Sequence, residues 1–128
     1  MKSGFHFLSL RVWQQAAELS RELFEWADEL EQNRRFRFAE QLRAATLSVT
    51  NNLAEGSGSC SNREFAAFVN IARRSVFEVA NMIYLLHPQP EQDETKLAQW
   101  LESLEGLSRQ LYAFRKSLLS DDSKWLSS

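Results

Sequence analysis

Apolar residues recur every three or four positions along most of this chain, which is the spacing of amphipathic helices. No segment shows the strict alternation of apolar and polar residues that is typical of a half-buried strand. The pattern therefore predicts an all-α fold in which four helices bury one another's apolar faces. The predicted helices cover Val12 to Leu30, about Arg35 to Ala54, residues 63–86, and Leu97 to Leu118.

The third predicted helix, residues 63–86, carries more apolar surface than one face of a bundle helix needs. Phe77 and Tyr84 flank one side of its core stripe, and Met82 and Leu85 flank the other side. We predict that these four residues form an oligomer interface, because a small bundle has no further element to cover them. The alternative is that this is the central helix of a crowded monomer.

The stretch TNNLAEGSGSCSNREF, residues 50–65, joins the second helix to the third. Gly56 or Gly58 can supply the residue that leaves the helical region at positive φ. Ser61 and Glu64 have the spacing of a capping box, in which the serine oxygen accepts the Glu64 backbone N–H and the glutamate returns to Ser61. These residues predict a chemically specified turn.

Two polar residues at the end of the second helix are interpreted first as parts of this turn. Asn52 falls near the edge of the apolar stripe, and a buried amide must find partners, for which turn carbonyls are the nearest supply. Glu55 is expected near the start of the third helix, where free N–H groups and Arg63 favour a carboxylate. A recognition site is the second interpretation.

Composition fits one globular domain, with 44% hydrophobic and 25% charged residues in 128. The net charge of −2 is unevenly distributed. Three Lys/Arg and six Asp/Glu give residues 1–32 a charge of −3, whereas seven Arg and three Glu give residues 33–74 a charge of +4. The remaining residues, with five basic and eight acidic groups, are again at −3. Such an uneven distribution of charge can create a local positive potential even though the net charge of the chain is negative.

Arginines and phenylalanines alternate at the start of the second helix, in the run NRRFRFAEQLR. Antiparallel pairing is expected to bring Arg43 close to Arg73 and Arg74, and an oligomer would repeat the cluster and raise its avidity for phosphate. In the alternative interpretation, Phe36 and Phe38 serve the fold, and acidic neighbours pair with the arginines. The candidate nucleic-acid-binding residues are Arg34, Arg35, Arg37, Arg43, Arg73 and Arg74.

No catalytic residues, metal site or cofactor are predicted, so the chain is expected not to be an enzyme. Cys60 is the only cysteine, and the two histidines, His6 and His87, lie in the predicted flexible N-terminus and at the opposite end of the third helix. Histidine and cysteine do not cluster at metal-site spacing. Cys60 is most simply a small loop residue.

No secretory signal is expected at the N-terminus. The first residues lack the long apolar segment of a secretory signal, and no run of about 18 apolar residues occurs. We therefore expect a cytoplasmic protein without a membrane partner. Residues 1–8 and 120–128 are predicted to be flexible. Trp125 in the second of these tails could dock on a partner or be incidental.

The motifs QLRAATLSVTNNLAEG, EFAAFVNIARRS and LRVWQQA together resemble the bacterial four-helix bundle family encoded in intervening sequences of large-subunit ribosomal RNA genes. The same fold resembles the accessory protein of diversity-generating retroelements. The likeness covers roughly residues 8 to 119. The chain departs from the family pattern at Ala44, Thr50 and Arg74. The residues that match it are Trp13, Leu42, Arg43, Ser48, Asn52, Ala54, Glu55, Gly56, Ser61, Glu64, Phe65, Phe68, Ile71, Ala72, Ser75 and Glu78.

This resemblance implies an up-and-down antiparallel four-helix bundle over residues 9–119, assembled into a homo-oligomeric ring that is typically a pentamer. In the retroelement relatives the ring is a basic scaffold for nucleic acid and a reverse transcriptase. The expected function is a non-enzymatic oligomeric scaffold that binds RNA or DNA. The alternative is an adaptor ring that binds another protein and has no nucleic-acid role.

Overall fold

The computed structural model describes residues 4–89, 92 and 95–126, the last six of these by their backbone alone. A short 3-10 helix, η1 (His6–Ser9), precedes four α-helices, and no strand occurs in the described part of the chain. The all-α fold and the positions of the four helices are thus confirmed. The helices are α1 (Arg11–Gln32), α2 (Phe36–Ser57), α3 (Asn62–Leu86) and α4 (Leu97–Leu126).

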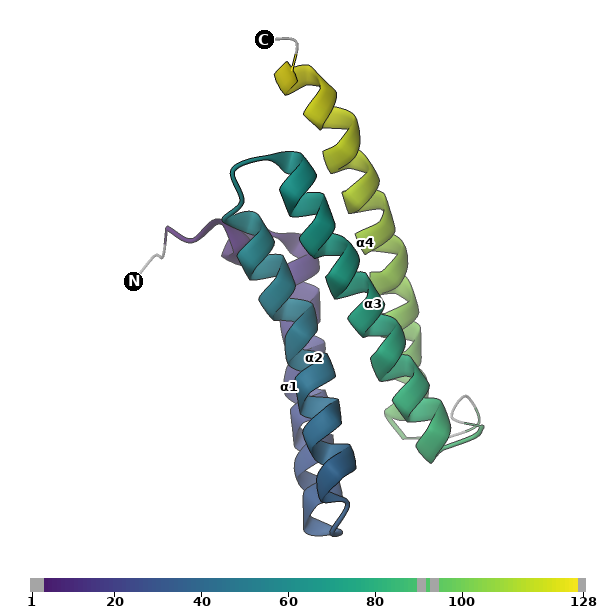
Figure 1. The fold of residues 1–128 in the computed structure, drawn as a ribbon. Helices are drawn as coiled ribbons and strands as arrows, with labels where there is room; N and C mark the ends of the chain where they lie inside the picture. The colour runs from purple at the N-terminus through teal and green to yellow at the C-terminus, as the bar shows by residue number, and fades with distance from the viewer. Residues whose placement is uncertain (1–3, 90–91, 93–94, 127–128) are drawn as a thin grey trace.

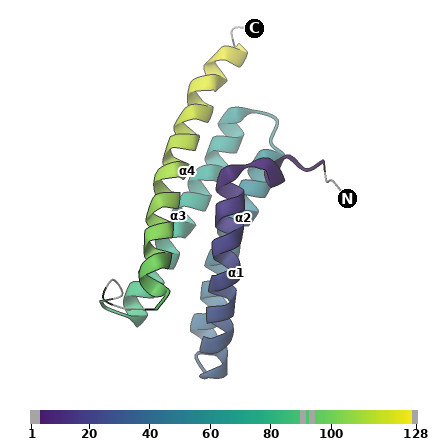
Figure 2. The ribbon, with the colours of Figure 1, turned by 180° about the vertical axis from the view of Figure 1, so that it is seen from behind.

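Successive helices run in opposite directions and form an up-and-down four-helix bundle (Figure 1). In that view α2 and α3 lie in front, with α1 behind α2 and α4 behind α3. Figure 2 shows the other side, where α1 and α4 face the viewer. These two helices contact one another much less than the other neighbouring pairs do. The bundle is therefore closed on three sides and open along the fourth. None of the described helices has the length and apolar character needed to cross a membrane.

The core is made by the apolar stripes that the sequence predicts, and all four helices contribute to it. Removing a leucine-sized side chain from water stabilises the fold by about 1.5–3 kcal/mol, so these stripes determine which face of each helix turns inward. The largest side chains with almost no exposure are Leu23, Leu42, Leu53, Val69, Val76, Val79, Ile83 and Leu111.

Gly56 allows α2 and α3 to approach closely near the turn that joins them. A Cβ atom at this position would lie 2.7 Å from Cδ1 of Phe65 and 2.8 Å from Cβ of Phe68. The prediction that a glycine here adopts positive φ is wrong, because no glycine in the described residues does so. Gly58 instead caps α2 at a φ of −89°. Gly56 is required for packing and not for backbone conformation.

The start of α3 is capped as its sequence predicts. Ser61 has extended backbone geometry, and its Oγ accepts the backbone N–H of Glu64 at 3.1 Å. This confirms the serine half of the capping box. Glu55 is exposed at the end of α2, where its carbonyl oxygen accepts the Gly58 N–H at 3.1 Å. The expected approach of the Glu55 carboxylate to α3 stays a prediction.

Asn52 finds its partners within α2 and not among the turn carbonyls. Its Nδ2 donates to the carbonyl oxygen of Ser48 at 2.7 Å and to Ser48 Oγ at 3.0 Å. The Ser48 hydroxyl is also hydrogen-bonded to the hydroxyl of Ser75 on α3, at 2.8 Å. Because small hydroxyl side chains meet here, α2 and α3 lie close together at this level.

Both ends of the chain differ from the predicted boundaries. Within the N-terminal segment predicted to be flexible, residues 1–3 lie outside the described part, but Phe7 of η1 packs on Trp13 of α1 with ring centroids 5.1 Å apart. At the other end, the helical backbone of α4 continues past residue 119 to Leu126. The side chain of Trp125 lies outside the described residues.

Candidate nucleic-acid interface and oligomer surface

The turn between α1 and α2 presents the first basic cluster, which we call the basic tip: Arg34, Arg35, Phe36 and Arg37. The backbone N–H of Arg35 donates to the Leu30 carbonyl at 2.9 Å, and that of Arg34 donates to the Glu31 carbonyl at 3.0 Å. This pair of bonds is a Schellman motif, which places its turn residue in the left-handed region. Arg34 occupies that place with a φ of 65°.

The side chains of the basic tip project into solvent. Arg34, Arg35 and Arg37 are exposed, and Phe36 between them is 60% exposed. No hydrogen bond or ion pair holds these three guanidinium groups within the part of the chain that the structure describes. They are therefore available to an external anion, and the phenylalanine ring is available for stacking.

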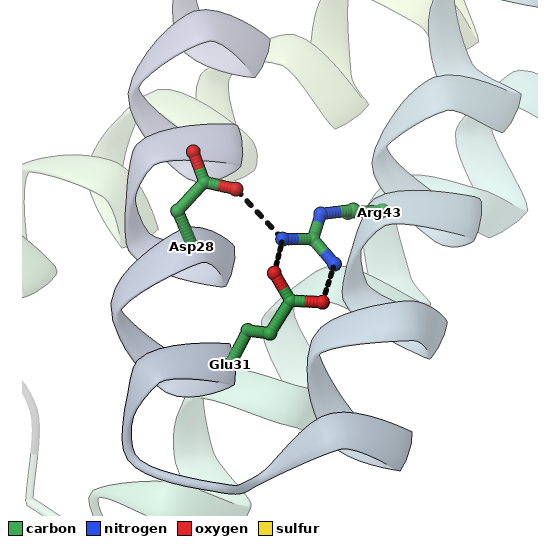
Figure 3. Close-up of polar contacts among 3 residues, drawn as sticks. All are labelled: Asp28, Glu31 and Arg43. Carbon is green, nitrogen blue, oxygen red and sulfur yellow. Dashed lines mark hydrogen bonds and ion pairs between the residues drawn. The ribbon is translucent and has the colours of Figure 1, made fainter.

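Arg43 does not belong to this free set. Its Nη2 lies 2.7 Å from Oδ1 of Asp28 and 3.2 Å from Oε2 of Glu31, and Nη1 lies 3.4 Å from Oε1 of Glu31 (Figure 3). The hydrogen bonds that Arg43 donates to Asp28, and then to Glu31, raise the pKa of Arg43 above its ordinary value. The carboxylates of Asp28 and Glu31 neutralise its charge, and these two ion pairs link α1 to α2.

The predicted proximity of Arg43 to Arg73 and Arg74 is wrong. Ser48 faces Ser75 across the antiparallel helices, so a residue five positions earlier on α2 lies level with one five positions later on α3. Arg43 is therefore level with about Ala80. The two basic groups also face different neighbours, because Arg43 turns to α1 whereas Arg73 turns to α4.

Arg73 is held by aromatic side chains of the α3 and α4 helices. Its Nε donates to the carbonyl oxygen of Ser108 at 3.2 Å. Its guanidinium carbon lies 4.9 Å from the ring centroid of Phe77 and 5.3 Å from that of Tyr112, which are cation–π distances. Arg74 is exposed one residue further on. The sequence did not indicate the role of Tyr112, because it depends on packing between helices.

Three of the four residues predicted at the oligomer interface are exposed. Phe77, Tyr84 and Leu85 are 51%, 47% and 69% exposed, whereas Met82 is only 5% exposed and belongs to the core. The assignment of Met82 to the oligomer interface is wrong. Met82 lies seven residues, or two helical turns, after Ser75, so the two side chains lie on the same face of α3. Both therefore face α2, which approaches α3 closely.

We call the exposed apolar surface of this side the α3–α4 face; it comprises Phe77, Tyr84 and Tyr112, the last of them 55% exposed. A cavity of about 210 Å³ adjoins it between the two helices, with Leu101 and Leu104 of α4 in its lining. Exposed aromatic rings beside an apolar cavity are typical of a surface that another protein covers.

His6 and Cys60, which are far apart in the sequence, line the same cavity of about 490 Å³. Phe65, Phe114 and Leu118 supply its apolar lining. The sequence placed His6 only in a flexible N-terminal segment, whereas η1 brings it beside the turn that carries Cys60. Within the described residues, no group of three or more His, Cys, Asp and Glu side chains could hold a metal ion.

Residues 9–113, from the end of η1 through most of α4, match the family described as 23S rRNA-intervening sequence protein. The chain belongs to this family. Searches of curated proteins and of solved structures gave no match. The 23S rRNA-intervening sequence protein family is the one that the three sequence motifs, LRVWQQA, QLRAATLSVTNNLAEG and EFAAFVNIARRS, resemble. Its matched range includes the basic tip, the Ser48 and Ser75 contact and the exposed residues of α3.

Proposed function

We propose that this protein is a non-enzymatic homo-oligomeric scaffold that binds nucleic acid through the basic tip. The observation that carries the proposal is the set of three exposed arginines without an internal partner, placed around an exposed Phe36. Arginine pairs with phosphate oxygens, and an aromatic ring stacks on an unpaired base. RNA is the first ligand to test, since the family description names 23S rRNA.

One tip supplies only three phosphate contacts, which is too few for tight binding at physiological salt. Several copies on one assembly would act together and raise the avidity by orders of magnitude. The exposed rings of the α3–α4 face support self-association, since each copy would cover apolar surface of the next. The resemblance to ring-forming relatives favours a pentamer.

Fluorescence anisotropy with a labelled single-stranded RNA of about 30 nucleotides, and with duplex RNA and DNA, tests the proposal over a salt series. The wild type should lose affinity steeply between about 50 and 200 mM salt. The salt slope is the change in the logarithm of the binding constant with the logarithm of the salt concentration, and each phosphate contact to a single strand contributes about 0.7 to its magnitude. Replacing Arg34, Arg35 and Arg37 by glutamine should therefore lower that magnitude by about 2 for each tip that binds the strand.

The matched control carries Gln at Arg43, Arg109 and Lys116, which changes the net charge by the same amount. Arg43 and Arg109 already have carboxylate partners, and Lys116 lies away from the tip. Its slope should stay close to that of the wild type. Equal slopes in the two triple variants, or weak binding without salt dependence, would overturn the proposal.

The adaptor alternative, with a reverse transcriptase or another protein as partner, makes a different prediction. A protein captured by the assembled bundle would remain bound after nuclease treatment, whereas one tethered through RNA or DNA would be released. A pull-down from cells, performed with and without nuclease, separates the two functions.

A further inference from the structure

A groove runs along the open side of the bundle, between α1 and α4. Two adjoining cavities, of about 380 and 390 Å³, share Glu22 and together extend from Gln15 to Glu29 along α1. This stretch corresponds to about 21 Å of helix at 1.5 Å per residue. Figure 2 shows the two helices that form its walls on the near side of the molecule. We call this feature the α1–α4 groove. Its apolar lining is Leu19, Trp26, Leu97, Trp100 and Leu107.

One wall of the groove is strongly anionic. Four glutamates stand on α1 at spacings of four, three and four residues, which places them on one face of the helix. The basic residue in the lining, Lys96, is already paired, because its Nζ lies 2.7 Å from Oε1 of Glu22. Trp100 Nε1 donates to the other oxygen of Glu22 at 3.1 Å. The remaining glutamates of the wall are Glu18, Glu25 and Glu29.

Gly106 lines the cavity of about 380 Å³ and keeps this part of the groove open, although the fold does not need a glycine there. It lies inside α4, where glycine costs about 1 kcal/mol relative to alanine. A Cβ at Gly106 would meet nothing nearer than Nη2 of Arg109 at 4.0 Å. This differs from Gly56, whose missing Cβ lets two helices touch. The absence of a side chain at Gly106 leaves room for something outside the chain.

We propose that the α1–α4 groove binds a cationic amphipathic helix of a partner protein. A third helix laid between α1 and α4 would cover the leucine and tryptophan floor, as amphipathic helices do in apolar grooves. Lysine or arginine along its edge would pair with Glu18 and Glu29, which have no ion-pair partner among the described residues, and with Glu25, whose charge also acts on Lys96. Phosphate groups would be repelled by the same wall, so this site excludes nucleic acid and is separate from the basic tip.

The test titrates the full-length protein with a labelled helical peptide of leucine and lysine, about 14 residues long to match the groove. A leucine and glutamate peptide of the same length is the control. Saturable binding of one lysine peptide per chain is expected, with none of the glutamate peptide. Gly106→Leu fills the groove without changing the net charge and should weaken binding at least tenfold. Because leucine suits a helix interior better than glycine, its melting temperature should not fall.

A second variant, Glu18→Gln with Glu25→Gln, leaves the Glu22 pair intact and should also weaken binding about tenfold at low salt. No saturable binding by the wild type, or equal binding by wild type and Gly106→Leu, would overturn the proposal. Light scattering of Gly106→Leu supplies a further check. A loss of oligomer mass would show that the groove holds a second copy of this chain, which would also overturn the assignment to a partner protein.

Discussion

Gly56 faces the ring of Phe65 so closely that an added Cβ would lie 2.7 Å from the ring atom Cδ1. Gly56→Ala should therefore destabilise the protein, although alanine favours the helix by about 1 kcal/mol. Overpacking typically costs about 1–3 kcal/mol, and here the second close neighbour is Cβ of Phe68, which moves only with its backbone. We expect a net loss of about 1–2 kcal/mol in the free energy of unfolding, measured in urea at fixed protein concentration.

Gly106→Ala is the matched control for this prediction. The same substitution, also inside a helix, meets no atom nearer than 4.0 Å and should raise the free energy of unfolding by about 0.5–1 kcal/mol. If both alanine variants were stabilised, the close contact between α2 and α3 would not limit the packing as described.

Arg34→Gly should stabilise the protein. The left-handed conformation destabilises a residue other than glycine by about 1–2 kcal/mol, and Arg34 adopts it. Glycine removes this cost, but its greater freedom in the unfolded chain offsets part of the gain. We expect a gain of about 0.5–1 kcal/mol in the free energy of unfolding. The same variant should bind RNA more weakly, since one guanidinium is lost from the basic tip.

Arg35→Gly removes the same charge at a residue with a φ of −92° and should not stabilise the fold. The pair of variants therefore separates backbone strain from charge. A left-handed arginine at an exposed turn is an outlier of the kind that often marks a functional position. Stability that is unchanged or reduced in Arg34→Gly would show that the arginine carries no strain.

Lowering the pH should weaken the interaction of Glu22 on α1 with Lys96 and with Trp100 at the start of α4. The hydrogen bond from Lys96, followed by that from Trp100, lowers the pKa of Glu22 below its ordinary value of 4.5. A carboxyl group with a lowered folded-state pKa adds stability above its unfolded pKa, and this contribution is lost as the pH falls through the folded value. Wild type should therefore exceed Glu22→Gln in stability at pH 7, and the difference should shrink as the pH drops below about 4.5.

Thermal unfolding of both proteins from pH 7 to pH 3 measures this difference. Because both partners are well exposed, the effect is expected to be small and to decrease with added salt. The hydrogen bond with Glu22 also raises the pKa of Lys96, so the lysine stays charged over this whole range. A difference that stays constant down to pH 3 would contradict the assignment.

Replacing Phe77 and Tyr84 by serine should reduce the molecular mass measured by light scattering. Both rings are exposed on the single chain, so the helical circular dichroism should be retained. The control replaces Leu8 of η1 and Leu47 of α2, which are also exposed but lie outside the α3–α4 face, and should leave the mass unchanged. A monomeric wild type at high concentration, or equal losses in both double variants, would contradict the proposed assembly.

Much of the fold was predictable from local rules. The helical period located all four helices, and Ser61 with Glu64 located the start of α3, because capping and amphipathic burial depend on residues close together in sequence. The exposure of the basic tip could be expected for the same reason, since Arg34 and Arg35 precede the apolar stripe of α2.

The contacts that side chains make between helices could not be predicted from local rules. The sequence contained Arg43, Met82 and Gly56, but only the register of α2 against α3 and the side on which α1 lies decided their roles. That arrangement paired Arg43 with Asp28, buried Met82, and pressed Gly56 against Phe65. Side-chain periodicity fixes which face of a helix is apolar, whereas relative rotation and separation depend on how four surfaces fit together. The sequence by itself therefore determined the helices and their caps, and packing alone decided which charges are free and where the bundle stays open.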